Sequence, residues 1–156
     1  MPIGLDEIRD NKELWQIIWD AVKFKQTTLD LSRNHLKELP PKIELIKSLN
    51  TLYLNGNQLK KLPPEIGQLK NLTELDLHSN QLKGLPPEIG QLKNLNILDL
   101  NHNNLTELPP EIGQLKNLTK LYLNHNNLTE LPPEIGQLKK LKSFNIDNNP
   151  ISNPIL

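Results

Sequence analysis

The stretch LPPEIGQLKNL at residues 62–72 returns unchanged at 85–95 and 108–118, and recurs with one substitution as LPPEIGQLKKL at 131–141. The copies begin 23 residues apart, so the chain is built from internal repeats. One such repeat is too small to bury its own apolar face, whereas a stack of repeats buries a continuous core between neighbours. The stretch therefore predicts a solenoid. We expect the repeated phrase to be scaffold, and function to lie in the residues that vary between copies.

A longer frame, L-x-x-L-x-L-x-x-N-x-L, recurs at the same period. It opens at Leu49 and at each of the next four 23-residue steps, and the first copy departs from it at Gln26. The inner apolar residues are separated by one position, and this alternation is typical of a short strand. The pairs are Leu29 and Leu31, Leu52 and Leu54, Leu75 and Leu77, Leu98 and Leu100, Leu121 and Leu123, and Phe144 and Ile146.

An asparagine follows the predicted strand in every copy. Its side-chain amide can both donate and accept hydrogen bonds, so it can satisfy backbone groups where the chain leaves the strand and turns under the next coil. The column contains Asn34, Asn57, Asn80, Asn103, Asn126 and Asn149.

Residues 26–151 resemble the leucine-rich-repeat family through this frame, which is present in six in-register copies. The resemblance implies an α/β solenoid, a right-handed superhelix with a parallel sheet on its concave side and short helical or 3₁₀ segments on its convex side. The 23-residue period with LPPEIGQL is similar to intracellular and bacterial members, including those that precede Ras-like domains in Roco proteins. The family implies protein partners.

The proline pair of the repeated phrase predicts a short helical or 3₁₀ segment after each strand. Two prolines preset φ and withhold amide donors, which suits a strand exit and the first turn of a helix. Ile66 and Leu69, three residues apart, are expected in the core. Gly67 permits a close approach of two backbones.

Residues 1–25 are predicted to form an N-terminal helical cap. Asp10 and Glu13 resemble a capping box, which predicts a helix over residues 11–25. Its apolar stripe is expected to contain Leu14, Ile17, Ile18, Ala21 and Val22, widened by Trp15 and Trp19. We favour a helix that covers the open edge of the first coil, and the alternative is an aromatic docking surface.

The C-terminal end has no comparable cover in the sequence. Residues 152–156 form a short tail, and the closing PISNPIL at 150–156 lacks both a second PPEIGQL and a terminal helix. Prolines blunt a sheet edge but cover little apolar area. This edge is therefore either weakly capped, or meets a second copy in a homodimer, or meets a further domain.

The residues between the strand leucines are expected to point onto the concave face, where neighbouring strands are about 4.8 Å apart. This spacing places Asp76 beside Asp99 and Tyr53 and Tyr122 on either side. Two aspartates this close repel each other and favour a Lys or Arg head group, and tyrosines are enriched at interface hot spots. We predict a partner-binding site that contains Tyr53, Glu74, Asp76, His78, Ile97, Asp99, His102, Lys120, Tyr122 and His125, with the histidines close to the aspartates or at the rim.

The alternative for this face is a merely soluble polar surface that recent duplications made uniform. Two further alternatives concern the whole chain. It could serve assembly through the weakly capped C-terminal edge, or it could be the repeat part of a larger regulatory GTPase or kinase protein. The identity of the protein partner does not follow from the sequence.

Composition excludes several other classes. Eighteen basic and eighteen acidic residues cancel without long blocks of one sign, so we expect neither nucleic-acid nor membrane partners. Cysteine is absent, which removes disulfides and thiolate sites and is expected of a protein that folds in a reducing compartment. With no export signal and no apolar window of about 20 residues, we expect a cytoplasmic protein.

Catalytic and metal sites are not predicted. Carboxylates one strand apart invite a hydrolase hypothesis, and His102 near His125 and Asp99 invites a metal hypothesis. Both histidines, however, belong to the duplicated phrase LNHNNLTELPPEIGQLK, and an open solenoid face offers no water-excluding cleft. We therefore expect no catalytic residue, no cofactor and no bound metal.

Overall fold

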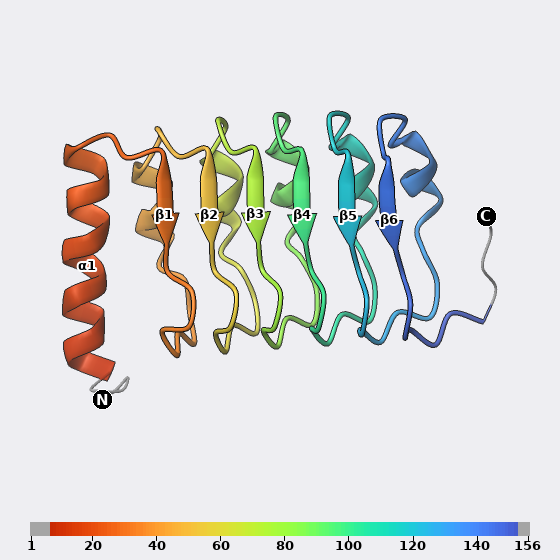
Figure 1. Cartoon of the computed structure of the whole chain (residues 1–156), viewed down its shortest axis with the longest axis horizontal. Coiled ribbons are helices and arrows are strands. Elements are labelled where there is room, and N and C mark those ends of the chain that lie inside the picture. Colours follow the sequence, from red (N-terminus) through yellow and green to blue (C-terminus); the bar gives the residue numbers. More distant parts are fainter. Residues whose placement is uncertain (1–6, 153–156) are drawn as a thin grey trace.

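The computed structural model describes residues 7–152, and the side chains from Lys12 onward (Figure 1). One helix is followed by strands that alternate with short 3₁₀ segments. The elements are α1 (Glu7–Lys23), β1 (Thr28–Asp30), η1 (Pro41–Leu45), β2 (Thr51–Tyr53), η2 (Pro64–Gln68), β3 (Glu74–Asp76), η3 (Pro87–Gln91), β4 (Ile97–Asp99), η4 (Pro110–Gln114), β5 (Lys120–Tyr122), η5 (Pro133–Gln137) and β6 (Ser143–Asn145).

The strands form one six-stranded parallel sheet in sequence order, with each strand paired to the strand of the next coil. Pairing is in register at the repeat period, so Leu52 lies opposite Leu75 and Leu75 opposite Leu98. The 3₁₀ segments lie behind the sheet, which confirms the predicted right-handed solenoid with the strands on one side and the 3₁₀ segments on the other (Figure 1). Equivalent residues of neighbouring coils are therefore adjacent in space.

Each strand buries its central residue and turns the flanking residues outward. In β3 the central Leu75 is fully buried, whereas Glu74 and Asp76 are half-buried on the sheet face. Leucines from the strands and the turns, together with isoleucines from the 3₁₀ segments, form one continuous apolar core. Burial of this area is the main stabilising contribution, at roughly 25 cal/mol per Å² of apolar surface.

The asparagine column satisfies buried backbone groups, as predicted. The Asn103 amide donates to the carbonyls of Leu77 and Leu100 at 3.0 and 3.2 Å. Its oxygen accepts from the backbone N–H of Leu82 at 3.0 Å. Asn57, Asn80 and Asn126 have the same kinds of partners and are likewise buried. Each asparagine thus connects two successive coils.

The proline pairs begin the predicted 3₁₀ segments. Pro86 has φ −69° and ψ 150°, and η3 starts at the next residue, Pro87. Ile89 then enters the core, and Gly90 packs against the following coil. A Cβ at Gly90 would lie 2.7 Å from the backbone oxygen of Glu111, so the coils approach more closely than a side chain permits. This explains why the phrase retains glycine.

The N-terminal helix differs from its prediction at its start. It begins at Glu7 and ends at Lys23, and Asp10 therefore lies within the helix. The predicted capping box is wrong, since an N-cap residue must precede the first helical turn. The spacing of Asp10 and Glu13 occurs inside the helix and does not mark its boundary.

The buried stripe of α1 is narrower than predicted. Leu14, Ile18 and Ala21 are buried, but Trp15 and Trp19 are 41% and 61% exposed, and Ile17 is also exposed. The predictions that Ile17 belongs to the stripe and that Trp15 and Trp19 widen it are therefore wrong. The helix lies against the edge of a single coil (Figure 1). That coil covers only the narrow face of the helix that carries Leu14, Ile18 and Ala21, which are spaced four and three residues apart.

The last coil is less buried than the inner coils. Its apolar side chains that are only partly buried are Leu131, Ile135, Leu141, Phe144, Ile146 and Ile151. A Cβ at Gly136 would meet nothing within 4 Å, in contrast to Gly90. The rest of the predicted tail, residues 153–156, lies outside the described residues. In the described part of the chain, no helix has the length and apolar character to cross a membrane.

Candidate functional site

The strand register brings the predicted face together. Asp76 pairs with Asp99 across β3 and β4, and Tyr53 and Tyr122 pair with them from the flanking strands β2 and β5. Two residues earlier on each strand, on the same face of the sheet, Ile97 lies between Glu74 and Lys120. Lys120 is exposed and the other members of these two rows are half-buried. The structure therefore places these predicted residues on one continuous surface.

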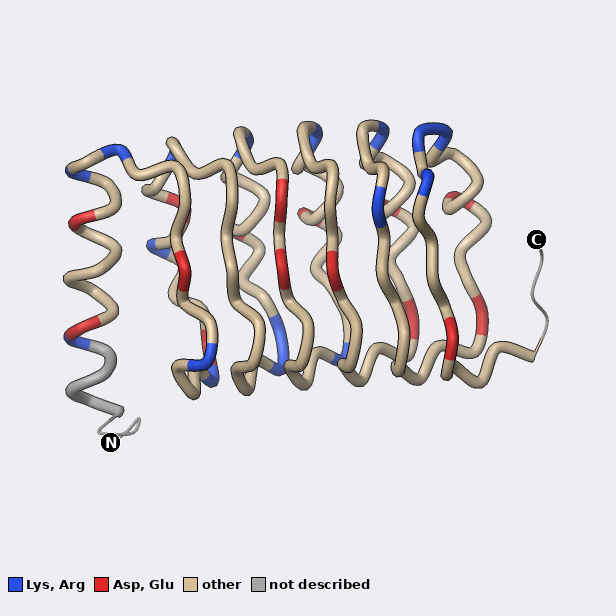
Figure 2. The backbone as a smooth tube through the Cα atoms, in the orientation of Figure 1, with Lys and Arg blue, Asp and Glu red and all other residues tan. Residues whose placement is uncertain are grey.

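Two carboxylates lie at the centre of this surface. Acidic residues lie side by side on β3 and β4, whereas lysines lie in the loops that precede the strands (Figure 2). Burial raises the pKa of the Asp99 carboxyl, and the negative charge of Asp76 raises it further. A hydrogen bond from the backbone N–H of Asn101, 3.0 Å long, opposes the rise in pKa, as do the nearby histidines His78 and His102. The pair thus favours a proton or another cation between its members.

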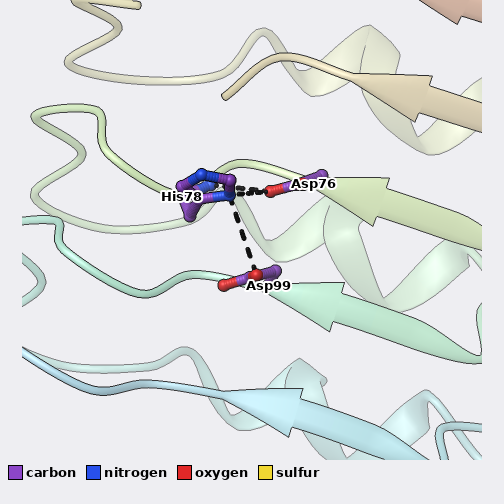
Figure 3. A group of neighbouring side chains, drawn as sticks. All are labelled: Asp76, His78 and Asp99. Carbon is purple, nitrogen blue, oxygen red and sulfur yellow. Dashed lines mark hydrogen bonds and ion pairs between the residues drawn. The ribbon is translucent and has the colours of Figure 1, made fainter. Parts of the chain in front are cut away.

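His78 lies directly beside both carboxylates (Figure 3). Its Nδ1 is 2.6 Å from Oδ1 of Asp76 and 3.7 Å from Oδ2 of Asp99. The same Asp76 oxygen accepts the backbone N–H of His78 at 3.1 Å. Asp76 and Asp99 are the last residues of their strands, and His78 lies two residues after the end of β3. The pairing of β3 with β4 therefore fixes the backbone positions that carry these three side chains.

The other two predicted histidines form a separate pair. The rings of His102 and His125 are stacked, with centroids 4.3 Å apart and an interplanar angle of 9°. Both residues are exposed and have φ of 58°. Nε2 of His125 lies 3.2 Å from Nδ2 of Asn148. These histidines lie in the neighbouring column of the rim, as their sequence positions indicated.

One group among the described residues has three metal-ligating side chains in reach of one another. It consists of Asp76, His78 and Asp99, whose ligand atoms all lie within 4.8 Å. Sequence reasoning placed these residues close together but did not recognise them as a ligand set. The signal was present as Asp-x-His at 76–78 followed by an aspartate one repeat later.

Comparison with protein families identifies the repeat. A family model for a leucine-rich repeat region matches residues 74–154, about half of the chain. The chain belongs to the leucine-rich-repeat family. A second model, for two copies of leucine-rich repeats, matches residues 47–87. Leucine-rich-repeat domains generally mediate protein–protein interactions and are generally not catalytic.

Solved leucine-rich-repeat structures resemble this chain. A leucine-rich-repeat protein of Leptospira interrogans has 43% sequence identity to this chain and a TM-score of 0.68. The match covers 87% of this chain and 40% of the Leptospira chain. An internalin of Listeria monocytogenes has 22% identity and a TM-score of 0.64 over 74% of this chain and 34% of its own, and it supports the fold alone. This chain thus spans less than half of either protein. No curated protein sequence matches it.

Proposed function

We propose that this leucine-rich-repeat chain binds a protein partner on its concave face and holds a basic side chain of that partner between Asp76 and Asp99. The observation that supports this most directly is the in-register pairing of two half-buried carboxylates. Their side chains are 18% and 22% exposed. A Lys or Arg head group there would relieve their repulsion, and desolvation would strengthen each charged hydrogen bond.

The neighbouring residues fit such an interface. Tyr53 and Tyr122 are half-buried on either side of the acidic pair, and tyrosine contributes large contact area at a small entropic cost. Ile97 adds an apolar surface two residues before Asp99 on the same strand. Among the described residues, the ion pairs of Asp76 and Asp99 are with His78 and none is with a lysine or arginine. A partner can therefore supply the missing strong cation.

The double variant Asp76→Ala with Asp99→Ala tests this proposal. We expect it to weaken binding by about 1–3 kcal/mol, or roughly 5- to 150-fold in Kd, for peptides selected from a random display library on the wild-type protein. Affinity is measured by titration calorimetry. We also expect lysine or arginine to be enriched among the selected peptides.

A matched control is Glu107→Ala with Glu130→Ala. These exposed glutamates lie one repeat apart, outside the strands, and their removal changes net charge by the same amount. We expect the control to retain wild-type affinity. Full affinity in the aspartate variant, or equal losses in both variants, would place the binding site elsewhere.

A second function is favoured by the last coil. Its core residues are only partly buried, and no described strand pairs with the outer edge of β6. At Gly90 the next coil packs against the glycine, whereas at Gly136 nothing lies within 4 Å of a Cβ position. An uncovered strand edge with apolar neighbours is a template for pairing. A second copy can present the same edge about a two-fold axis, because a symmetric contact needs only one self-complementary surface.

Light scattering across a wide concentration range tests this assembly. If the edge is an interface, we expect the mass to double as concentration rises, and Ile151→Asp to restore the monomer by placing a charge on the apolar edge. Circular dichroism checks that the variant is folded. A wild-type monomer at every concentration would exclude this function and leave the concave face as the binding surface.

A further inference from the structure

We propose that Asp76, His78 and Asp99 form a binding site for a divalent transition-metal ion such as Zn²⁺. The site is built from the ends of two adjacent strands and the residue that follows one of them. It reverses the expectation from the sequence, which contained no metal site. The proposal does not depend on the proposed function, although an ion and a partner's basic side chain would be alternative occupants of the same position.

The donor set selects the class of ion. One imidazole nitrogen and two carboxylate oxygens are ligands that suit Zn²⁺, Co²⁺ and related ions. Ca²⁺ and Mg²⁺ prefer six or more oxygen ligands, so a nitrogen donor argues against them. Three protein ligands leave the fourth tetrahedral position to water. His78 thus distinguishes this group from an ordinary acidic cluster.

The distances allow coordination with small side-chain rotations. Ligand atoms bound to one tetrahedral Zn²⁺ at about 2.0–2.1 Å lie roughly 3.3 Å from each other. The Nδ1 atom of His78 is now 2.6 Å from one carboxylate and 3.7 Å from the other, so the first separation must widen by about 0.7 Å and the second close by about 0.4 Å. The metal would take the place of the hydrogen between Nδ1 of His78 and Asp76, and the neutral imidazole would then carry its proton on Nε2.

Backbone hydrogen bonds hold the carboxylates in place. The backbone N–H of His78 donates to Oδ1 of Asp76 at 3.1 Å, and the backbone N–H of Asn101 donates to Oδ1 of Asp99 at 3.0 Å. These bonds orient the carboxylate groups and leave Oδ2 of Asp99 toward His78 (Figure 3). Such outer contacts strengthen metal binding because they limit ligand motion.

Duplication of repeats does not account for this group. The positions equivalent to His78 in the other coils are Ser32, Asn55, Asn101, Asn124 and Asp147. Histidine therefore occurs there only once, between β3 and β4, the pair of adjacent strands that both end in aspartate. The stacked pair His102 and His125, in contrast, comes from two copies of one phrase.

The repeats supply matched variants for the test. His78→Asn introduces the residue that three equivalent positions already contain, and Asp99→Asn introduces the residue found at Asn145. The control, His102→Ser with His125→Ser, introduces the residue found at Ser79, whose φ of 59° is the same within a degree. These substitutions are therefore compatible with the solenoid backbone, and thermal unfolding verifies this for each protein.

Zn²⁺ titration by calorimetry and visible absorption with Co²⁺ measure occupancy in the whole chain. We expect one ion per wild-type chain and a Co²⁺ spectrum of tetrahedral type. His78→Asn and Asp99→Asn should each weaken binding at least tenfold and remove the spectrum, and the double serine control should retain both. Absence of wild-type binding, retention of binding by His78→Asn, or its loss in the serine control would each overturn the proposal.

Discussion

Replacing Gly90 by alanine is expected to destabilise the solenoid by about 3 kcal/mol, because the new methyl group has no space. Its Cβ would lie 2.7 Å from the backbone oxygen of Glu111 and 2.7 Å from the side-chain oxygen of Gln114. A backbone oxygen cannot move without separating two coils. The loss would therefore extend beyond one contact to the packing of η3 against η4. Urea unfolding monitored by circular dichroism measures it.

Gly136→Ala is the control within the same repeated phrase. Nothing lies within 4 Å of its Cβ position, so we expect it to be neutral or to stabilise the fold by up to about 1 kcal/mol through a less flexible unfolded chain. If both substitutions cost the same, backbone conformation and not coil spacing would explain the glycine.

Asn103→Ala is expected to cost about 3–4 kcal/mol, since it removes several buried hydrogen bonds at once. The N–H of Leu82 would lose its partner. The carbonyls of Leu77 and Leu100 would each lose one of two side-chain donors and keep Asn80 and Asn126, respectively. Asn103 is 5% exposed, so water does not reach these groups easily. Native-state hydrogen exchange should show faster exchange at the Leu82 amide and its neighbours.

The equivalent change at Asn149 should cost clearly less. Asn149 donates to the carbonyls of Leu123 and Ile146 at 2.8 and 2.9 Å, but it is only partly buried at the end of the stack. Water can replace part of its hydrogen bonding after Asn149→Ala. Similar losses at both positions would contradict the view that burial sets the cost.

The repeating part of the fold was predictable because the same local signals recur at a fixed period. Apolar alternation around Leu75, the proline pair and the asparagine column each predicted one part of a coil, and the structure confirms all three. The start of α1 was not predictable, because Asp10 and Glu13 have cap-like spacing yet lie inside the helix. The exposure of Trp15 depends on how much of the helix the first coil covers, which no local pattern encodes.

The sequence predicted which residues of the candidate site are neighbours on the sheet, but not how their side chains are oriented. A fixed repeat and parallel pairing suffice to place Asp76 beside Asp99 and to place tyrosines on either side. The ring direction of His78 was not accessible, since it depends on the turn in which Asp76 accepts the backbone N–H two residues later. The raised pKa of Asp99 likewise depends on burial and on neighbours from another coil.

The position of the two tryptophans makes intrinsic fluorescence a probe of one part of the molecule. Both lie in α1, and the coils described here contain only tyrosines and a phenylalanine as aromatic residues. Intrinsic tryptophan emission therefore reports on the N-terminal helix alone, while the far-ultraviolet signal averages over the whole chain. Trp15 and Trp19 are substantially exposed, so an added quencher reaches them in the native state. The helix and the coils can thus be followed separately, without attaching a dye.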